Sequence, residues 1–342
     1  MTASPCMPAE WVAHERTWMA FPPPNDTFGE RGEADLERAR RAWLQVARTI
    51  AKYEPVTMIV DPGDEHEARA QLSDGINYVV HQLDDAWMRD AGPSFAYNGD
   101  ELVAVDWVFN GWGAQDWAMF ENDAQLGRFI AAEAGVRVVD SQLVNEGGGI
   151  HVDGRGTLLL TKTVQLDPGR NPGKTTDEVE AEFARAIGTT TPLWFERGLT
   201  RDYDAFGTRG HVDIIASFAG EGRVLVHDQR DPKHPDHLVS EQLRATLQDA
   251  VDANGNRIEV INVPAPKQLR DHHGWVDWSY INHYVCNGAV ILCAFGDEND
   301  EVAADILQRC YPDRVIELVD ARDIFAFGGG IHCITQQQPV RP

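Results

Sequence analysis

A glycine-rich turn near the end of the chain presents a single cysteine. Three consecutive glycines, residues 328–330, precede Ile331, His332 and Cys333. Glycine tolerates positive φ and lets other groups approach the backbone closely, so this turn could present the thiol as a nucleophile. The alternative is a cysteine buried in a structural turn, because free cysteine is among the most buried residue types. Other polar segments of the chain favour chemistry.

Three further polar or glycine-rich segments lie where apparent structural repeats join. They span residues 87–93, 145–149 and 210–213. If the repeats surround an axis, equivalent joins meet at one central cavity. That cavity would contain the Cys333 thiol and the His211 imidazole. It would also contain the carboxylates of Asp90, Glu146 and Asp213.

Cys333 and His211 would supply the thiol and the imidazole used in thiol-based nucleophilic catalysis. An unperturbed thiol has a pKa of about 8.5, so attack near neutral pH needs a neighbouring base or cation. Glu146 could hold the imidazole in one tautomer, which is the orienting role in a catalytic triad. Glu146 could equally cap the glycine turn that follows it, and this alternative stays open.

Asp90 and Asp213 are two carboxylates more than such a triad needs. Negative charge beside a thiolate is unfavourable unless the substrate is a cation. A guanidinium group suits these carboxylates because it is planar, always charged, and donates hydrogen bonds in pairs. This set of one thiol, one imidazole and three carboxylates therefore indicates attack by the thiol on a guanidinium carbon. Without that function, Asp90 could pair with Arg89, and Asp213 could bond to His211 along one face of a strand.

The composition excludes several other classes of function. Among 342 residues, 54 are acidic and 30 are basic, which gives a formal charge of −24. Such a surface repels nucleic acid and anionic membranes, whereas it attracts a small cationic partner. The sequence contains no run of eighteen apolar residues that would predict a membrane span, and the N-terminus lacks the features of a signal peptide. We therefore expect a cytoplasmic protein.

The five cysteines are expected to be free thiols. Their number is odd, no CxxC pair occurs, and a chain without an export signal is expected in a reducing compartment. Structural zinc is not expected for the same reason. A metal site built from His211, Asp213 and Glu146 is chemically reasonable but would leave Cys333 without a role. The sequence thus predicts neither a metal nor a cofactor.

Two nucleotide-binding patterns are also rejected. Residues 169–175 imitate a phosphate-binding loop, but the segment is one residue short and contains a proline. Neither triple glycine precedes a predicted helix, which a dinucleotide-binding loop requires.

Hydrophobic periodicity predicts an α/β chain in which a strand–helix–strand order recurs five times. The predicted elements include helices over 33–53, 64–72 and 120–134, and strands over 56–60 and 76–81. The later units are expected over 102–140, 157–195, 223–263 and 289–318, with additional strands over 212–218 and 280–285. Because no long linker separates these units, residues 1–342 are predicted to form one domain.

Several motifs resemble those of the agmatine deiminase family. They are Met7 to Trp11, Trp87 to Pro93, Glu146 to Gly148, Gly210 to Asp213 and Gly328 to Pro339. Agmatine deiminases belong with arginine deiminases and a bacterial type of peptidylarginine deiminase among the guanidine-modifying enzymes of pentein fold. The resemblance spans residues 7–339. It implies a five-fold pseudosymmetric α/β propeller of ββαβ-type repeats. It also implies hydrolysis of agmatine to N-carbamoylputrescine and ammonia, a step in putrescine synthesis, without metal or cofactor.

The resemblance further implies roles for individual residues. Cys333 would be the nucleophile that carries a covalent amidino intermediate, and His211 would be the general acid and base. Glu146 would pair with that chemistry, while Asp90 and Asp213 would bind the guanidinium nitrogens. His151 and His332 are interpreted as structural. The tryptophans are ambiguous, because Trp87 and Trp112 are assigned to substrate binding but Trp87, Trp107 and Trp112 would also suit the core.

Two segments depart from the family pattern. Agmatine deiminases usually carry an asparagine between the last glycine of the cysteine turn and the isoleucine, but here Gly330 is followed directly by Ile331. Residues 204–209 lack the family's Glu-Thr-Asn run. Both segments are expected to border the substrate, so another guanidine, such as arginine or a peptide-borne arginine, remains an alternative. A non-catalytic guanidine-binding protein is a further one. A homo-oligomer is compatible with the sequence.

Overall fold

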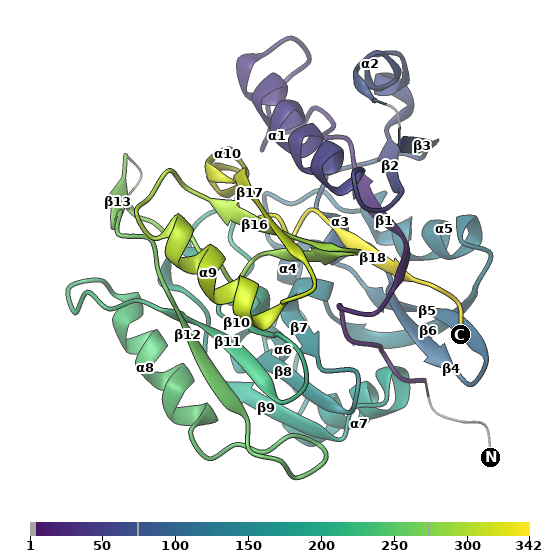
Figure 1. Cartoon of the computed structure of the whole chain (residues 1–342). Coiled ribbons are helices and arrows are strands. Elements are labelled where there is room, and N and C mark those ends of the chain that lie inside the picture. The colour runs from purple at the N-terminus through teal and green to yellow at the C-terminus, as the bar shows by residue number, and fades with distance from the viewer. Residues whose placement is uncertain (1–4, 74, 273) are drawn as a thin grey trace.

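A computed structural model describes residues 5–73, 75–272 and 274–342, and its strands form small sheets that repeat one topology (Figure 1). In each repeated sheet, the middle strand pairs antiparallel with one neighbour and parallel with the other. A helix connects the two parallel strands, because parallel strands cannot be joined by a tight turn. The described residues contain this ββαβ unit five times, which confirms the predicted repeat.

Four units are continuous in the sequence. The first comprises β4 (Ser94–Asn98), β5 (Glu101–Val108), α5 (Leu126–Glu133) and β6 (Arg137–Val144). The second comprises β7 (Ile150–Val152), β8 (Thr157–Thr161), α7 (Thr176–Ile187) and β9 (Thr191–Phe195). The third comprises β10 (Ala216–Phe218), β11 (Arg223–Asp228), α8 (Asp236–Leu247) and β12 (Glu259–Pro264). The fourth comprises β15 (Tyr284–Cys286), β16 (Ala289–Ala294), α9 (Asp300–Cys310) and β17 (Val315–Asp320).

The fifth unit joins the two ends of the chain. Its elements are β18 (Gln336–Pro339), β1 (His14–Ala20), α1 (Ala34–Ile50) and β2 (Val56–Val60), extended by α2 (Glu65–Gln71) and β3 (Ile76–Val80). The first strand, β1, lies antiparallel to the last strand, β18, and the two are adjacent in Figure 1. This pairing places the cysteine turn, which immediately precedes β18, against the N-terminal part of the chain.

Short helical turns and one two-stranded ribbon connect these units. The α-helical turns are α3 (Met88–Ala91), α4 (Gly111–Ala114), α6 (Lys162–Gln165) and α10 (Arg322–Ala326). The 3-10 turns are η1 (Pro62–Asp64), η2 (Asp123–Gln125), η3 (Gly147–Gly149), η4 (Thr200–Tyr203) and η5 (Val212–Ile214). The ribbon pairs β13 (Arg270–Asp271) with β14 (Gly274–Trp275).

Local sequence signals explain the helix ends and the buried strands. Helix α7 begins with a capping box in which Thr175 and Glu178 satisfy each other's backbone N–H groups, and it ends at Gly188 with φ of 74°. Helix α1 buries an apolar stripe that includes Leu36 and Trp43. Strand β16, with the sequence AVILCA, is almost fully buried because parallel strands are covered on both faces.

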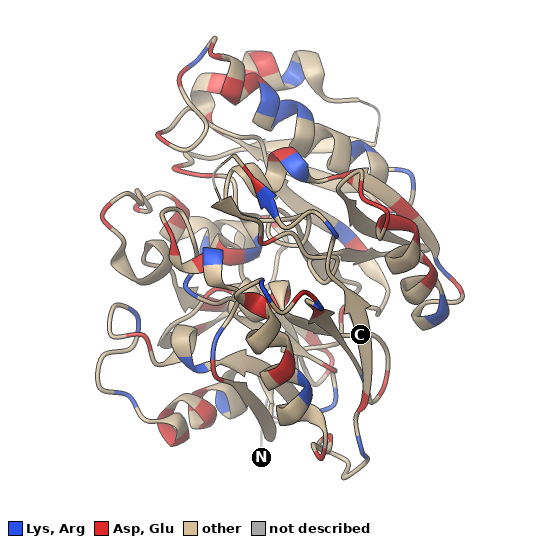
Figure 2. Ribbon diagram, turned by 90° about the vertical axis from the view of Figure 1, so that its left-hand side faces the viewer, with Lys and Arg blue, Asp and Glu red and all other residues tan. Residues whose placement is uncertain are grey.

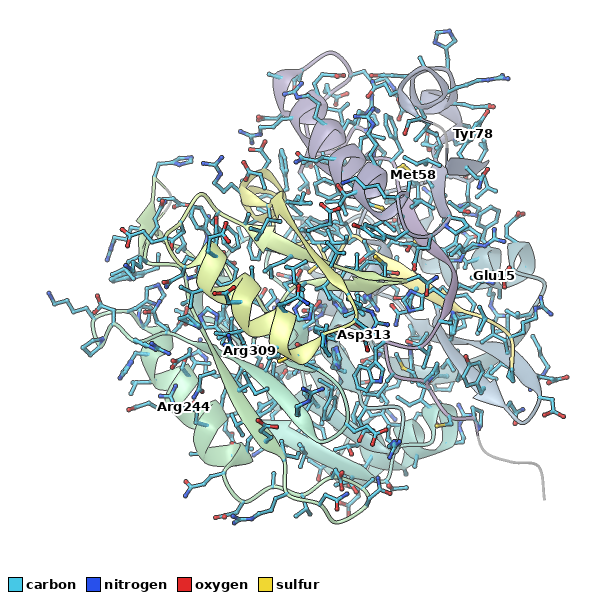
Figure 3. All side chains as sticks on the ribbon, viewed as in Figure 1. Glu15, Met58, Tyr78, Arg244, Arg309 and Asp313 are labelled. Atoms are coloured by element: carbon cyan, nitrogen blue, oxygen red, sulfur yellow. The ribbon has the colours of Figure 1, made fainter. Side chains whose placement is uncertain are left out.

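The helices lie outside the sheets and the apolar side chains fill the space between them. Met58 on β2 is fully buried beneath α1, whereas Arg244 and Arg309 lie on α8 and α9 toward the outside (Figure 3). Acidic and basic residues are spread over the helices and loops, with acidic ones more frequent (Figure 2). In residues 5–73, 75–272 and 274–342, we find no helix both long and apolar enough to cross a membrane.

Three predicted elements are shorter than expected. The strand predicted over 212–218 is η5 followed by the three-residue β10, and the strand predicted over 280–285 is confined to β15. The helix predicted over 120–134 is interrupted, with η2 preceding α5. Each segment mixes polar and apolar residues without a regular period where the predicted element is missing, so periodicity does not locate its boundary. The α/β class is confirmed, while the radial propeller arrangement of the units stays a prediction.

Candidate active site

The polar joins predicted from the sequence meet in the structure. Turn η3 contacts both α3 and η5. The backbone N–H of Arg89 in α3 donates to the carbonyl of Cys333 at 3.0 Å, which fixes the cysteine turn against α3. All five residues predicted for chemistry are buried there, and they are Asp90, Glu146, His211, Asp213 and Cys333.

The Cys333 thiol lies among polar groups and faces a carboxylate. The Asn282 side-chain amide donates to Sγ at 3.3 Å, and the Gly330 N–H donates at 3.4 Å. Oδ2 of Asp213 lies 3.6 Å from Sγ. Burial and the charges of Asp213 and Asp90 raise the pKa of Cys333 well above its ordinary value. The raised pKa favours the protonated thiol near neutral pH. Within the described residues, no hydrogen bond joins Cys333 directly to His211.

His211 contacts two carboxylates. Its Nε2 lies 3.2 Å from Oε2 of Glu146, and its Nδ1 lies 3.7 Å from Oδ1 of Asp90. Burial by itself lowers the pKa of His211, but Asp90, Glu146 and Asp213 outweigh this effect and raise that pKa to about 9. The imidazole is therefore a cation at neutral pH and can donate a proton.

Glu146 is held by an arginine that the sequence did not identify. Nε of Arg170 lies 3.0 Å from both carboxylate oxygens of Glu146, and both side chains are buried. Burial opposes ionisation, but Arg170 and His211 lower the pKa of Glu146 to about 2. Glu146 makes no capping hydrogen bond to η3, so the capping alternative is wrong. Arg170 lies within residues 169–175, the segment that imitates a phosphate loop.

Asp90 accepts hydrogen bonds from two fixed donors. The Trp112 indole N–H donates to Oδ2 at 2.9 Å, and the Gly148 N–H donates to Oδ1 at 3.1 Å. Burial, with help from the nearby acidic groups, raises the pKa of Asp90 to about 6 despite His211. Arg89 turns instead to Glu10, 3.3 Å away, so a surface ion pair between Arg89 and Asp90 is not found.

Asp213 uses its two oxygens differently. Oδ2 lies 2.8 Å from Nδ1 of His332, whereas Oδ1 is buried without a hydrogen-bond partner in the described part of the chain. Burial opposes ionisation, but His332, His211 and Arg89 lower the pKa of Asp213. The strand pairing of Asp213 with His211 is wrong, because the intervening residue lies in η5. Asp213 thus presents an ionised, unpartnered oxygen.

Two glycines allow these groups to converge. A Cβ atom at Gly148 would lie 2.5 Å from Nδ1 of His211 and 2.9 Å from Oδ1 of Asp90. A Cβ atom at Gly329 would lie 2.7 Å from the Trp87 ring. Real Cβ contacts are not this short, so both positions exclude any side chain.

An aromatic pocket leads to the thiol. Cys333 and Asp90 line it together with rings that include Trp87, Trp112, Trp117, Phe206 and Phe327. Trp112 stacks on Trp117, with ring centroids 5.3 Å apart and planes 17° apart. Trp87 and Trp112 therefore both line the pocket, and their part in substrate binding stays a prediction.

Trp112 and Trp107 differ in backbone conformation and in packing. Trp112 has φ of 55° and ψ of 45°, a left-handed conformation that costs a bulky residue on the order of 1 kcal/mol or more. This conformation accompanies the indole hydrogen bond to Asp90. Trp107 instead lies in a separate core cluster, where its N–H donates to Ser94 at 2.9 Å.

One buried cluster has side chains of metal-ligating type. Among the described residues, Glu10, His151 and His332 each offer one ligand atom within 4.8 Å of the others. The Glu10 carboxylate is already engaged, because His332 lies 2.8 Å away and Nη1 of Arg89 lies 3.3 Å away. A guanidinium this close repels a divalent cation. The residues present therefore fit an internal ion-pair network better than a metal site.

Comparisons with known proteins identify the family. Residues 6–339 match the model of the Porphyromonas-type peptidyl-arginine deiminases. The chain belongs to this family, whose deiminases are hydrolases acting on C–N bonds. It is 58% identical to a Streptomyces coelicolor protein provisionally named agmatine deiminase, over 97% of this chain and 98% of the relative. It is 36% identical to the agmatine deiminase of Ectopseudomonas mendocina, with 98% and 95% of the two chains covered.

A solved structure gives the same result for the fold. The agmatine deiminase of Enterococcus faecalis superposes with a TM-score of 0.92 at 30% sequence identity, covering 99% of this chain and 97% of that one. The mixed α/β architecture of small repeated sheets is therefore shared with a known deiminase.

Proposed function

We propose that this protein hydrolyses agmatine to N-carbamoylputrescine and ammonia, with Cys333 as the nucleophile. The observation that carries the proposal is a buried cluster in which Cys333 and Asp90 line one pocket, His211 lies 3.7 Å from Asp90, and Asp213 lies 3.6 Å from Cys333. The relatives named as agmatine deiminases support the choice of substrate.

The carboxylates would bind the guanidinium before reaction. Asp90 lines the aromatic pocket together with Cys333, and the Asp213 carboxylate lies beside Cys333, with Oδ2 3.6 Å from Sγ. A planar guanidinium between them would complete charge-assisted hydrogen bonds on two edges. Its positive charge would also offset the two carboxylates, and the pKa of Cys333, which they raise, would fall. Substrate binding would thus favour the thiolate.

The chemistry then proceeds through a covalent intermediate. The Cys333 thiol loses its proton to solvent when the guanidinium binds, the thiolate Sγ forms a bond to the guanidinium carbon, and the bond from that carbon to one terminal nitrogen breaks. The leaving nitrogen takes a proton from the His211 imidazolium and departs as ammonia. His211, now neutral, removes a proton from water, whose oxygen attacks the amidino carbon. The C–S bond breaks, the thiol is restored, and the carbamoyl product leaves.

The pocket walls suit an alkyl chain that ends in a second cation. The rings of Trp87, Trp117 and Phe327 give apolar faces for methylene groups, and tryptophan faces also attract cations. A neighbouring hollow beside Trp117 is lined by Asp26, Glu30, Asp84 and Asp85, among other residues. Such carboxylates would favour the terminal ammonium of agmatine. Synthesis of putrescine is the pathway in which we place this reaction.

Ammonia release from a panel of guanidines tests the proposal. Agmatine should be the best substrate of the wild type, and Cys333→Ala should release no ammonia while keeping the same unfolding temperature. Another guanidine is the second candidate, because residues 204–209 depart from the family pattern and Phe206 of this loop lines the pocket. Faster turnover of arginine or a peptidyl-arginine would select that candidate. The absence of ammonia with every guanidine would contradict both.

A further inference from the structure

We propose that Glu10 is a positioning residue for guanidine binding: through His332, it fixes the orientation of the Asp213 carboxylate beside Cys333. This inference rests on the proposed function and extends it to a residue more than three hundred positions away from the cysteine turn.

A continuous buried chain of contacts connects the three side chains. Oε1 of Glu10 lies 2.8 Å from Nε2 of His332, and Nδ1 of His332 lies 2.8 Å from Oδ2 of Asp213. All three residues are at most 5% exposed. His332 immediately precedes Cys333, so the same chain of contacts that holds Asp213 also holds the nucleophile turn.

The hydrogen-bond acceptors around the His332 ring define its protonation state. Both ring nitrogens face carboxylate oxygens, and an ionised carboxylate only accepts hydrogen bonds. Both nitrogens must therefore carry a proton, which makes His332 an imidazolium between two anions. Nη1 of Arg89 lies 3.3 Å from the same Glu10 oxygen and favours its ionised form.

The charged groups around His332 agree with this assignment. Burial and Arg89 lower the pKa of His332, but Glu10 and Asp213 raise it above its ordinary value. Burial opposes ionisation of Glu10, yet His332, His151 and Arg89 hold the pKa of Glu10 well below its usual range. The titratable groups that face His332 are Glu10, Arg89, His151, Asp213 and His283.

The arrangement has a consequence for substrate binding. A carboxylate free to rotate could turn either oxygen toward the His332 imidazolium, but here the ring is fixed from its far side by Glu10. The His332 backbone N–H also donates to Asn282 at 3.0 Å, which restrains the ring further. The Asp213 carboxylate consequently keeps Oδ2 between Nδ1 of His332 and Sγ of Cys333. Loss of the Glu10 charge should release this orientation without removing any group that contacts the substrate.

Two measurements on Glu10→Gln test the proposal. The KM for agmatine should rise about tenfold while kcat stays within about threefold, because binding is affected before chemistry. In a Cys333→Ala background, the Kd for the same guanidine should rise by a similar factor. Nitrogen NMR of labelled histidines at pH 7.5 should show both ring nitrogens of His332 protonated in the wild type and only one in Glu10→Gln. The His332 signals are identified by their loss in His332→Gln.

His151→Gln is the matched control. His151 also faces Glu10, at 3.6 Å, but within the described residues it makes no hydrogen bond or ion pair with Asp213, so its loss should change KM less than about twofold. An unchanged KM in Glu10→Gln, or a neutral His332 in the wild type, would overturn the proposal. The wild-type NMR spectrum still tests the protonation of His332 if Glu10→Gln does not fold. A wild type that releases no ammonia would contradict the proposed function, while guanidine binding to Cys333→Ala and the spectrum would still test the role of Glu10.

Discussion

Sγ of Cys333 lies 3.6 Å from Oδ2 of Asp213, so the proposed nucleophile of this site faces a carboxylate. A thiol next to an anion holds its proton, in contrast to thiols that pair with a histidine cation. Reactivity of Cys333 should therefore depend on a cation entering the pocket.

Alkylation should reveal this dependence. At pH 7.5, neutral iodoacetamide should modify Cys333 slowly, whereas a haloacetamidine, which carries a guanidinium-like cation, should modify it at least about tenfold faster. Mass spectrometry identifies the modified residue. Cys310→Ala serves as the control, because that thiol lies on α9, and this variant should react like the wild type. Labelling of Cys286 in place of Cys333 would contradict the assignment.

The pH dependence of agmatine binding should follow the ionisation of the Asp90 carboxyl group. Its pKa, raised to about 6, means that the carboxylate is present above pH 6 and is protonated as the pH falls through that value. The Kd of agmatine for Cys333→Ala should thus be constant from pH 7 to 8 and rise about tenfold per pH unit below 6. Calorimetric titration measures this dependence. Asp90→Asn should bind weakly throughout and lose this dependence, and a Kd that is flat down to pH 4.5 would exclude Asp90.

Removal of the Trp112 indole N–H should weaken substrate binding. Trp112→Phe keeps an aromatic ring but loses the hydrogen bond to Asp90, and such bonds to charged groups contribute about 1.5–3 kcal/mol. Steady-state kinetics should show kcat/KM lowered about 10- to 100-fold. Trp107→Phe is the comparison, since it loses a similar bond to Ser94 inside the core. Equal effects on kcat/KM in both variants would mean that Trp112 acts only through stability.

Agmatine should be preferred to arginine by more than about a hundredfold in kcat/KM. Arginine carries a carboxylate that needs a cation, but the nearby arginines are engaged: Arg89 with Glu10, Arg170 with Glu146, and Arg209 with Asp167 at 3.2 Å. Arg209→Ala should therefore change neither substrate by more than about threefold. Comparable activity on arginine that is lost in Arg209→Ala would instead show that Arg209 binds the carboxylate.

Chelators should leave the activity unchanged. Glu10, His151 and His332 contribute ligand-type atoms to one cluster, but the Arg89 guanidinium at 3.3 Å from Glu10 makes a divalent cation unfavourable there. Ammonia release after dialysis against a strong chelator measures this directly, with metal content followed in parallel. Activity that is lost on dialysis and restored by zinc or manganese would establish a metal requirement.

The sequence by itself determined which side chains are candidates for chemistry and that they lie close together in the fold. Cys333, His211, Glu146, Asp90 and Asp213 each lie in a short polar segment between repeats, and a repeating fold brings such segments together. The α/β class followed from periodicity for a similar reason, because burial of an apolar face is a local property of each helix and strand. The free state of all five cysteines was also predicted, and it is confirmed.

Only the tertiary structure decided which group contacts which. Glu10 and His332 are 322 residues apart, and Asn282 is 51 residues from the thiol to which it donates. Such contacts depend on how separate units pack, and no local pattern encodes that packing. The sequence did not identify Arg170 for the same reason, since its contact with Glu146 joins two separate segments. The structure also showed that Cys333 contacts Asp213, which lies in η5 where the sequence predicted a strand.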